Sequence, residues 1–133
     1  MAQSGNFYEI TLKRPHLEWG SYRYTNSRGI IYGEGYIPIP ANIAYSYEIF
    51  NQNGTNGQDI LGQNIFHCHS ADGLYDGILR AQGNQDNSRY AKQLAGDKNL
   101  KAIGTWFYQI NAEIGDKIRV TWISPTEIRI EKI

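Results

Sequence analysis

Alternation of apolar and polar residues along the chain predicts a protein built mainly from β-strands. It is clearest near the end, where Ile118, Val120 and Trp122 of KIRVTWI (117–123) alternate with polar residues. In EIRIEKI (127–133), Ile128, Ile130 and Ile133 oppose charged neighbours. This two-residue period is typical of a strand with one buried face. FYEITL (7–12) shows the same alternation and is followed by Lys-Arg-Pro, which ends a strand. These three segments are therefore predicted strands.

The middle of the chain predicts an edge strand, a short helix and a hairpin. YIPIP (36–40) is extended, but its two prolines cannot donate sheet hydrogen bonds, which favours an edge strand. A short helix is expected over residues 41–50. NQNGTNGQD (51–59) consists of turn-forming residues and is predicted to be an exposed loop. NIFHCHS (64–70) and LYDGILRAQ (74–82) flank Ala-Asp-Gly, so a hairpin is expected there.

Two polar segments lack this alternation. Residues 13–33 are predicted to be a long structured arm, and residues 83–101 a glycine-bracketed loop with one or two helical turns over 88–94. TWFYQI (105–110) is predicted to be a strand. The chain should then contain about six or seven strands. The expected fold is mainly β, a seven-stranded open or pseudo β-barrel with one or two short helices.

Length and composition indicate one domain spanning residues 1–133. The 133 residues suit a single domain, and 41% hydrophobic residues are enough for one core. Thirteen basic and thirteen acidic side chains cancel, so net charge favours neither nucleic acid nor membrane as a partner. No apolar run approaches the roughly 20 residues of a membrane span, and the start lacks a signal-peptide pattern. The sequence therefore predicts a cytoplasmic protein that does not bind membranes.

The strongest enzymatic signal is the tripeptide His67-Cys68-His69. In a strand both histidines would lie on one face and could bind a metal, but a third ligand would have to come from His16 or an unassigned carboxylate. The favoured interpretation is two surface histidines with Cys68 buried opposite, and a metal-dependent enzyme is the weaker alternative. No pair of carboxylates has a recognisable catalytic context. We therefore expect no catalytic residue, no metal, no cofactor and no enzymatic activity in this chain.

Two basic segments are candidates for binding DNA. Residues 11–32 contain four basic and one acidic side chain, and residues 80–101 contain five and two, so each has a balance of +3. The chain is also rich in amides, with eleven Asn and eight Gln. Lys and Arg reach phosphates, while Asn, Gln and Arg pair with base edges in the major groove. Taken by themselves, however, these residues favour the alternative interpretation of ordinary polar surface loops.

Three stretches, in this order, resemble a B3-type DNA-binding pseudobarrel: GYIPIPANIAYSYEIF, NIFHCHSADGLYDGILRAQ and GTWFYQINAEIGDKIRVTWI. This family includes the DNA-recognition domains of several prokaryotic restriction endonucleases, and the likeness covers most of residues 7–133. In the family two arms grip the DNA major groove. By position they correspond to a first arm, residues 21–33, and a second arm, residues 82–93.

The resemblance implies sequence-specific binding of double-stranded DNA as the target-recognition part of a restriction-modification system. A nuclease domain or subunit would be its partner. The implied DNA-binding residues are Arg23, Asn26, Ser27 and Arg28 in the first arm, and Gln82, Asn84, Gln85, Asn87, Ser88, Arg89 and Lys92 in the second.

A β-barrel module that binds a carbohydrate, a protein or a small ligand is the alternative function. Trp19, Tyr22 and Tyr24 could stack on a ligand or on bases, or could anchor the first arm. Amide-rich loops suit sugars as well as bases. Salt distinguishes the two functions, because affinity for DNA falls steeply with salt.

Overall fold

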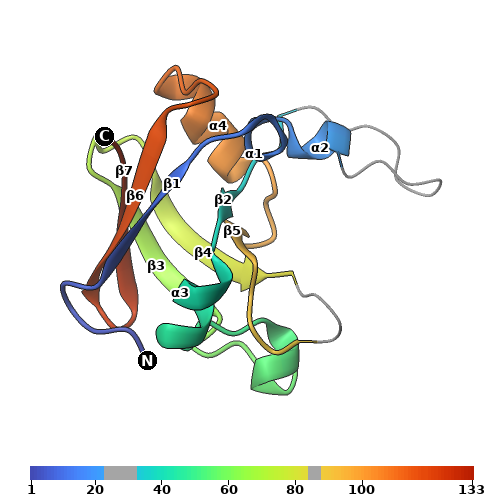
Figure 1. Cartoon of the computed structure of the whole chain (residues 1–133), viewed down its shortest axis with the longest axis vertical. Coiled ribbons are helices and arrows are strands. Elements are labelled where there is room, and N and C mark those ends of the chain that lie inside the picture. Colours follow the sequence, from blue (N-terminus) through green and yellow to red (C-terminus); the bar gives the residue numbers. More distant parts are fainter. Residues whose placement is uncertain (23–32, 84–87) are drawn as a thin grey trace.

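Seven strands form one curved sheet in the computed structural model, which describes residues 1–22, 33–83 and 88–133 (Figure 1). The sheet order is β1-β6-β7-β3-β4-β5-β2, so β1 and β2 form its edges. The predicted mainly β, barrel-like fold with seven strands is thereby confirmed. The strands are β1 (Phe7–Thr11), β2 (Ile37–Pro38), β3 (Ile65–Ser70), β4 (Asp76–Gln82), β5 (Gln93–Gly96), β6 (Lys117–Ser124) and β7 (Glu127–Lys132).

Parallel pairing of β3 with β7 joins the two hairpins of the sheet. Cys68 lies opposite Ile128 in this pairing, and the backbone N–H of His67 donates to the Thr126 carbonyl at 3.0 Å. The remaining neighbours in the sheet are antiparallel. β3 therefore connects the hairpin β6–β7 to the hairpin β3–β4 that leads to the second arm.

The hydrophobic core lies inside the curve of the sheet. The inward residues that the alternation predicts for β6, Ile118, Val120 and Trp122, are all buried. The Trp122 ring packs against Tyr47 and Phe66, with centroid distances of 5.4 Å and 6.0 Å. The strands with one apolar face thus behave as their sequence pattern predicts.

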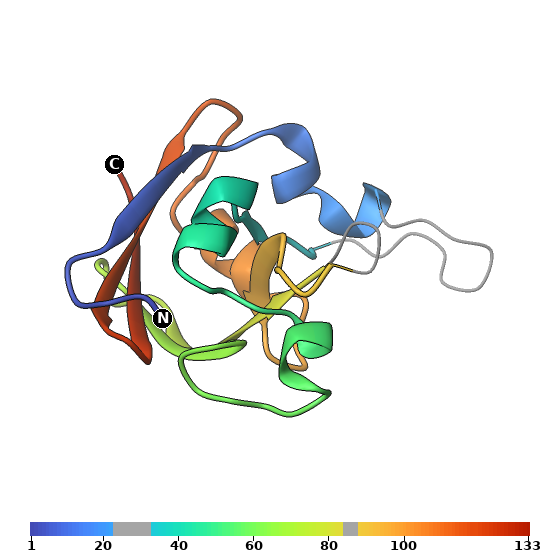
Figure 2. The ribbon, with the colours of Figure 1, turned by 60° about the horizontal axis from the view of Figure 1, so that its bottom comes forward.

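Short helices close the ends of the sheet (Figure 2). The described residues contain more helical segments than the one or two expected, and α1 and α2 lie where an irregular arm was predicted. α3 starts directly after Pro40, as expected, but ends four residues before Phe50. No helix in the described ranges is long and apolar enough to cross a membrane. The helices are α1 (Arg14–Leu17), α2 (Trp19–Tyr22), α3 (Ala41–Ser46), the 3-10 helix η1 (Gln52–Thr55) and α4 (Ala102–Gln109).

Two predicted elements were wrong. The predicted strand TWFYQI belongs to α4, where Ile103, Trp106 and Phe107 are buried together at the helical spacing i, i+3, i+4. A strand could not bury the adjacent Trp106 and Phe107 on one face. β5 occupies part of the predicted loop 83–101. It pairs with both β4 and β2 and is buried over residues 94–96, so it shows no alternation.

Candidate nucleic-acid interface

The ends of the second arm are held by β4 and β5. Gln82 pairs in register with Gln93, and the backbone N–H of Lys92 donates to the Gln82 carbonyl at 2.9 Å. The Lys92 carbonyl in turn accepts from the Ile39 N–H at 2.8 Å. Gly83 has φ of 85°, in the left-handed region that glycine adopts at low cost, and it turns the chain away from β4. The arm therefore begins and ends on the sheet itself.

Arg89 lies on the returning half of the second arm, which packs on residues 49–51. The Asn51 N–H donates to the Arg89 carbonyl at 3.0 Å, and Phe50 and Tyr90 form an antiparallel bridge. The Arg89 guanidinium lies 5.6 Å from the Phe50 ring centroid and 5.2 Å from that of Tyr90. Its Nη2 donates to the Tyr90 hydroxyl at 3.1 Å. Two aromatic rings thus orient an exposed cation.

Basic side chains around β5 differ from those on β6 and β7 in their partners. On the far strands Arg119 contacts Glu9 at 2.7 Å and Glu131 at 3.4 Å, and Lys132 lies 3.5 Å from Asp116. The charges of Arg119 and Lys132 are therefore balanced locally, whereas Lys117 forms no ion pair with a described residue. The segment from the second arm to α4 is different. It carries exposed cations that form no ion pair with any residue the structure describes: Arg89, Lys92, Lys98 and Lys101.

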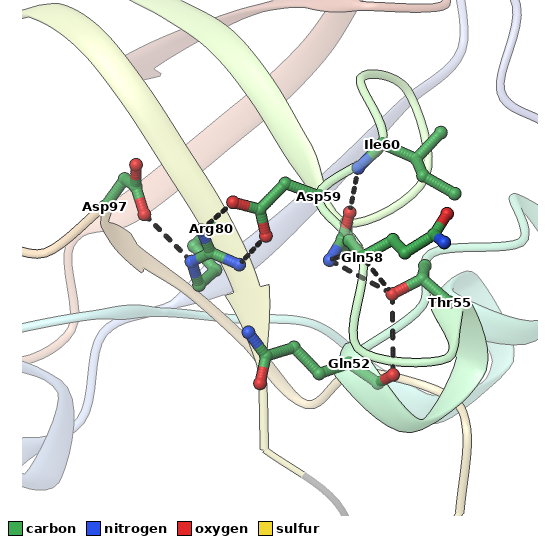
Figure 3. A network of polar contacts seen from close by, with 8 residues as sticks. Gln52, Thr55, Gln58, Asp59, Ile60, Arg80 and Asp97 are labelled. Carbon is green, nitrogen blue, oxygen red and sulfur yellow. Dashed lines mark hydrogen bonds and ion pairs between the residues drawn. The ribbon is translucent and has the colours of Figure 1, made fainter.

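Arg80 does not belong to this set, although it contributes to the positive balance of residues 80–101. Its two Nη atoms donate to the Asp59 carboxylate at 2.6 Å and 2.9 Å, and its Nε donates to Asp97 at 2.8 Å (Figure 3). The hydrogen bonds to Asp59 and Asp97 raise the pKa of the guanidinium above its usual value. Its side chain is only 13% exposed. Arg80 therefore ties the loop 51–64 to β4 rather than offering a charge to a ligand.

The loop 51–64 is organised, and it includes residues 51–59, for which only an exposed loop was predicted. Thr55 and Asn64 are buried in it. The Asn64 Nδ2 donates to the Gln58 carbonyl at 2.9 Å and to Thr55 Oγ1 at 3.3 Å, while its Oδ1 accepts from the Ile60 N–H at 2.8 Å. A groove of about 360 Å³ separates this loop from the end of β4, lined by residues 51–53 and 80–83. The loop thus lies directly beside the second arm.

The structure describes the two ends of the first arm, which are the last two residues of α2 and Gly33. Trp19 is buried, with its ring centroid 5.0 Å from that of Tyr36, so it anchors the start of the arm and offers no free face for stacking. Lys101 lies beside Gly33, because a Cβ built at Gly33 would be 3.9 Å from Lys101 Cδ. Figures 1 and 2 both show the end of α2 on the same side of the molecule as the end of β4.

Most of the predicted site residues lie outside the described residues, so the structure does not place them: Arg23, Asn26, Ser27, Arg28, Asn84, Gln85 and Asn87. Those that it places are Gln82, Ser88, Arg89 and Lys92, which gather at the base of the second arm. The prediction omitted Lys98 and Lys101. Their basic character is visible in the sequence, but the position of Lys101 beside the first arm depends on folding.

The histidine pair does not form a metal site in the described structure. His67 is exposed and Cys68 is buried opposite, as expected for a strand. Among residues 1–22, 33–83 and 88–133, no group of three or more His, Cys, Asp or Glu could hold a metal ion. Burial, with a smaller effect of the Asp76 charge, raises the pKa of the Cys68 thiol, which leaves it a protonated and weak nucleophile.

Comparison with known proteins shows a fold similar to that of a solved structure. No family model matches the chain, and no curated protein is significantly similar in sequence. The structure is similar to the N-terminal domain of Helicobacter pylori LlaJI.R1, with a TM-score of 0.51 and 13% sequence identity. The match covers 96% of this chain and 87% of that one. At this identity the comparison shows a shared fold, and membership of the B3-type family stays a hypothesis.

Proposed function

We propose that this chain binds double-stranded DNA sequence-specifically, with its two arms in the major groove, as the target-recognition part of a restriction-modification system. One observation carries the proposal. Four cations cluster between the second arm and α4, and they are exposed and form no ion pair with the described residues: Arg89, Lys92, Lys98 and Lys101. On β6 and β7, by contrast, Arg119, Arg129 and Lys132 are paired with carboxylates, and Lys117 is the exception. Such a surface attracts phosphates even in a chain of zero net charge.

Different roles follow from the different surroundings of these cations. Arg89, oriented by Phe50 and Tyr90, offers a planar guanidinium that suits the O6 and N7 atoms of guanine. Lys92 and Lys101 suit phosphates, which they would contact as point charges. Base contacts by the undescribed arm residues, Arg23 and Asn84 among them, remain part of the proposal and rest on the resemblance.

The shared fold supports the same class of function. LlaJI.R1, whose N-terminal domain it resembles, is a restriction-system protein. We assign no catalytic residue and no cofactor to this chain, so cleavage would be supplied by a nuclease domain or subunit. We also propose that the protein acts in the cytoplasm.

Selection from a randomised duplex library, at two salt concentrations, tests the proposal. We expect a short enriched motif, whose affinity falls steeply as salt rises because bound phosphates release counterions. If no motif is enriched and duplex affinity is negligible at low salt, the DNA proposal fails. A glycan array then tests the alternative of a carbohydrate-binding module, whose affinity would scarcely respond to salt.

Two variants and one control then assign the roles. Arg89→Ala should cost about 1–3 kcal/mol on the enriched site and relax the preference at one base position. Lys92→Ala should weaken binding to all duplexes alike and reduce the salt slope by about one. Lys117→Ala is the control, because Lys117 is exposed on β6, away from β5 in the sheet order. Equal small losses in all three variants would contradict the assignment.

A further inference from the structure

The buried side chain of Asn51 joins the two sides of the second arm. Asn51 is only 4% exposed and immediately precedes η1. Its Nδ2 donates to three backbone carbonyls: that of Gly83 at 3.1 Å, that of Ser88 at 2.8 Å and that of Tyr90 at 3.2 Å. Gly83 lies on the outgoing side of the arm, and the other two lie on the returning side. One amide group therefore holds both sides together.

The other half of the same amide is fixed to η1. Asn51 Oδ1 accepts from the N–H groups of Asn53 at 2.9 Å and Gly54 at 3.2 Å. The loop also packs closely on the arm, because a Cβ built at Gly54 would lie 2.7 Å from the Arg89 carbonyl oxygen. The Asn51 side chain is thus fixed within the ordered loop 51–64. Its hydrogen bonds to the second arm hold that arm in place relative to the loop.

Only a side-chain amide can both donate to the carbonyls of the arm and accept from the N–H groups of η1 at this position. Asparagine donates through Nδ2 and accepts through Oδ1, whereas an aspartate carboxylate only accepts. An Asp at position 51 would keep the bonds from Asn53 and Gly54, but its second oxygen would face the carbonyls of the arm. Buried carbonyls left without a donor are costly. The returning side of the arm would then separate from the loop.

We propose that Asn51 is a positioning residue for DNA recognition, which holds residues 88–92, and with them Arg89 and Lys92, in their binding orientation. This inference rests on the proposed function. An arm that is ordered before binding loses less entropy when the complex forms. The apparent affinity is proportional to the fraction of molecules whose arm is in the binding orientation, so it falls when that fraction falls. Asn51 would therefore influence DNA affinity without touching DNA.

Asn64 offers a matched control for the test. It is also a buried asparagine, and its amide likewise donates to and accepts from backbone groups of the loop. Its side-chain hydrogen bonds are to Thr55, Gln58 and Ile60, and none is to a residue of the second arm that the structure describes. Asn64→Asp should therefore destabilise the protein by the same chemistry without releasing the arm.

The experiment compares Asn51→Asp with Asn64→Asp on the selected duplex, at a temperature where both variants are folded. Loss of the three hydrogen bonds from Nδ2 to the arm should reduce the affinity of Asn51→Asp about ten- to thirtyfold. Asn64→Asp should lose less than about threefold, since its effect is on global stability. Equal losses in the two variants, or unchanged affinity of Asn51→Asp, would overturn the proposal.

A measurement on the wild-type protein without DNA keeps the test independent of whether the variants fold. The side-chain amide protons of Asn51 should exchange with solvent more slowly than those of the exposed Gln52 and Asn53. Equally fast exchange would overturn the role of Asn51. If wild-type protein binds no duplex at all, the proposed function fails, whereas the exchange result still decides whether the Asn51 amide is held by its hydrogen bonds to the arm.

Discussion

Trp106 Nε1 donates a hydrogen bond to Asp72, with 3.1 Å between Nε1 and Oδ2. This bond joins α4 to the turn between β3 and β4. Asp72 also accepts from the Ser70 hydroxyl and from the Leu74 N–H. Burial alone would raise the pKa of Asp72, but these hydrogen bonds outweigh burial and lower it. The buried indole of Trp106 is thereby satisfied by a carboxylate of a hairpin turn.

Replacement of Asp72 should destabilise the fold through this bond. We expect Asp72→Ala to lower the free energy of unfolding by about 1–3 kcal/mol, because Trp106 Nε1 is left without its acceptor. Asp76→Ala is the control, since Asp76 is exposed at the start of β4, and it should change stability by no more than about 0.5 kcal/mol. Urea denaturation measures both. A loss of the same size in the two variants would refute a special role for Asp72.

Replacement of Gly104 by alanine should destabilise the protein, whereas the same replacement of an exposed helical glycine usually stabilises it. An exposed Gly→Ala change inside a helix usually stabilises by about 1 kcal/mol. A Cβ at Gly104, however, would lie 2.0 Å from the Gly33 carbonyl oxygen, so backbone atoms at the base of the first arm would have to move. We therefore expect Gly104→Ala to lower the melting temperature.

Thr105→Ala in the same helix serves as the reference for helix propensity. Thr105 is exposed, and alanine should leave the melting temperature unchanged or raise it slightly. If Gly104→Ala proved as stable as Thr105→Ala, the close approach of α4 to Gly33 would not constrain the protein. Thermal unfolding followed by circular dichroism is sufficient to compare the two.

Much of the sheet could be predicted from the sequence, because strands with one buried face show their two-residue period. The α4 helix was missed although its signal was present, in the spacing of Ile103, Trp106 and Phe107. The aromatic run 106–108 was instead interpreted as a strand. β5 had no usable signal, because it is buried between neighbours and too short for any period. Elements buried on several sides therefore escape a pattern-based prediction.

The candidate site could be predicted only in part. The basic character of residues 80–101 is visible in the sequence, but no pattern shows that Arg80 pairs with Asp59 and Asp97. Asn51 looks like one more turn residue in NQNGTNGQD, and its hydrogen bonds to the second arm arise only on folding. Charges are thus predictable from sequence, whereas the partners that neutralise or position them are not.

His16 should make the stability of the protein depend on pH. Its Nδ1 accepts from the Lys13 N–H at 2.9 Å, and its ring packs on Tyr36 beside the first arm, with centroids 5.2 Å apart. Burial, and secondarily the Lys13 charge, lower the pKa of His16. The folded state therefore binds a proton more weakly than the unfolded state. The stabilisation is present above the unfolded pKa, about 6.5, and is lost as pH falls through the folded pKa.

The test compares the wild type with His16→Gln in urea denaturation series between about pH 7.5 and pH 5, where histidine titrates and most carboxylates do not. The wild type should lose stability with falling pH, and the variant should lose less because it has no proton to gain at this position. At pH 7.5 the variant should be the less stable of the two, since glutamine does not reproduce the ring contact with Tyr36. Parallel curves for the two proteins would mean that the pH dependence arises elsewhere. A smaller change of the free energy of unfolding with pH in His16→Gln would show that His16 causes part of the pH dependence. His16 lies at the base of the first arm, where its carbonyl accepts from the Tyr36 N–H at 3.1 Å.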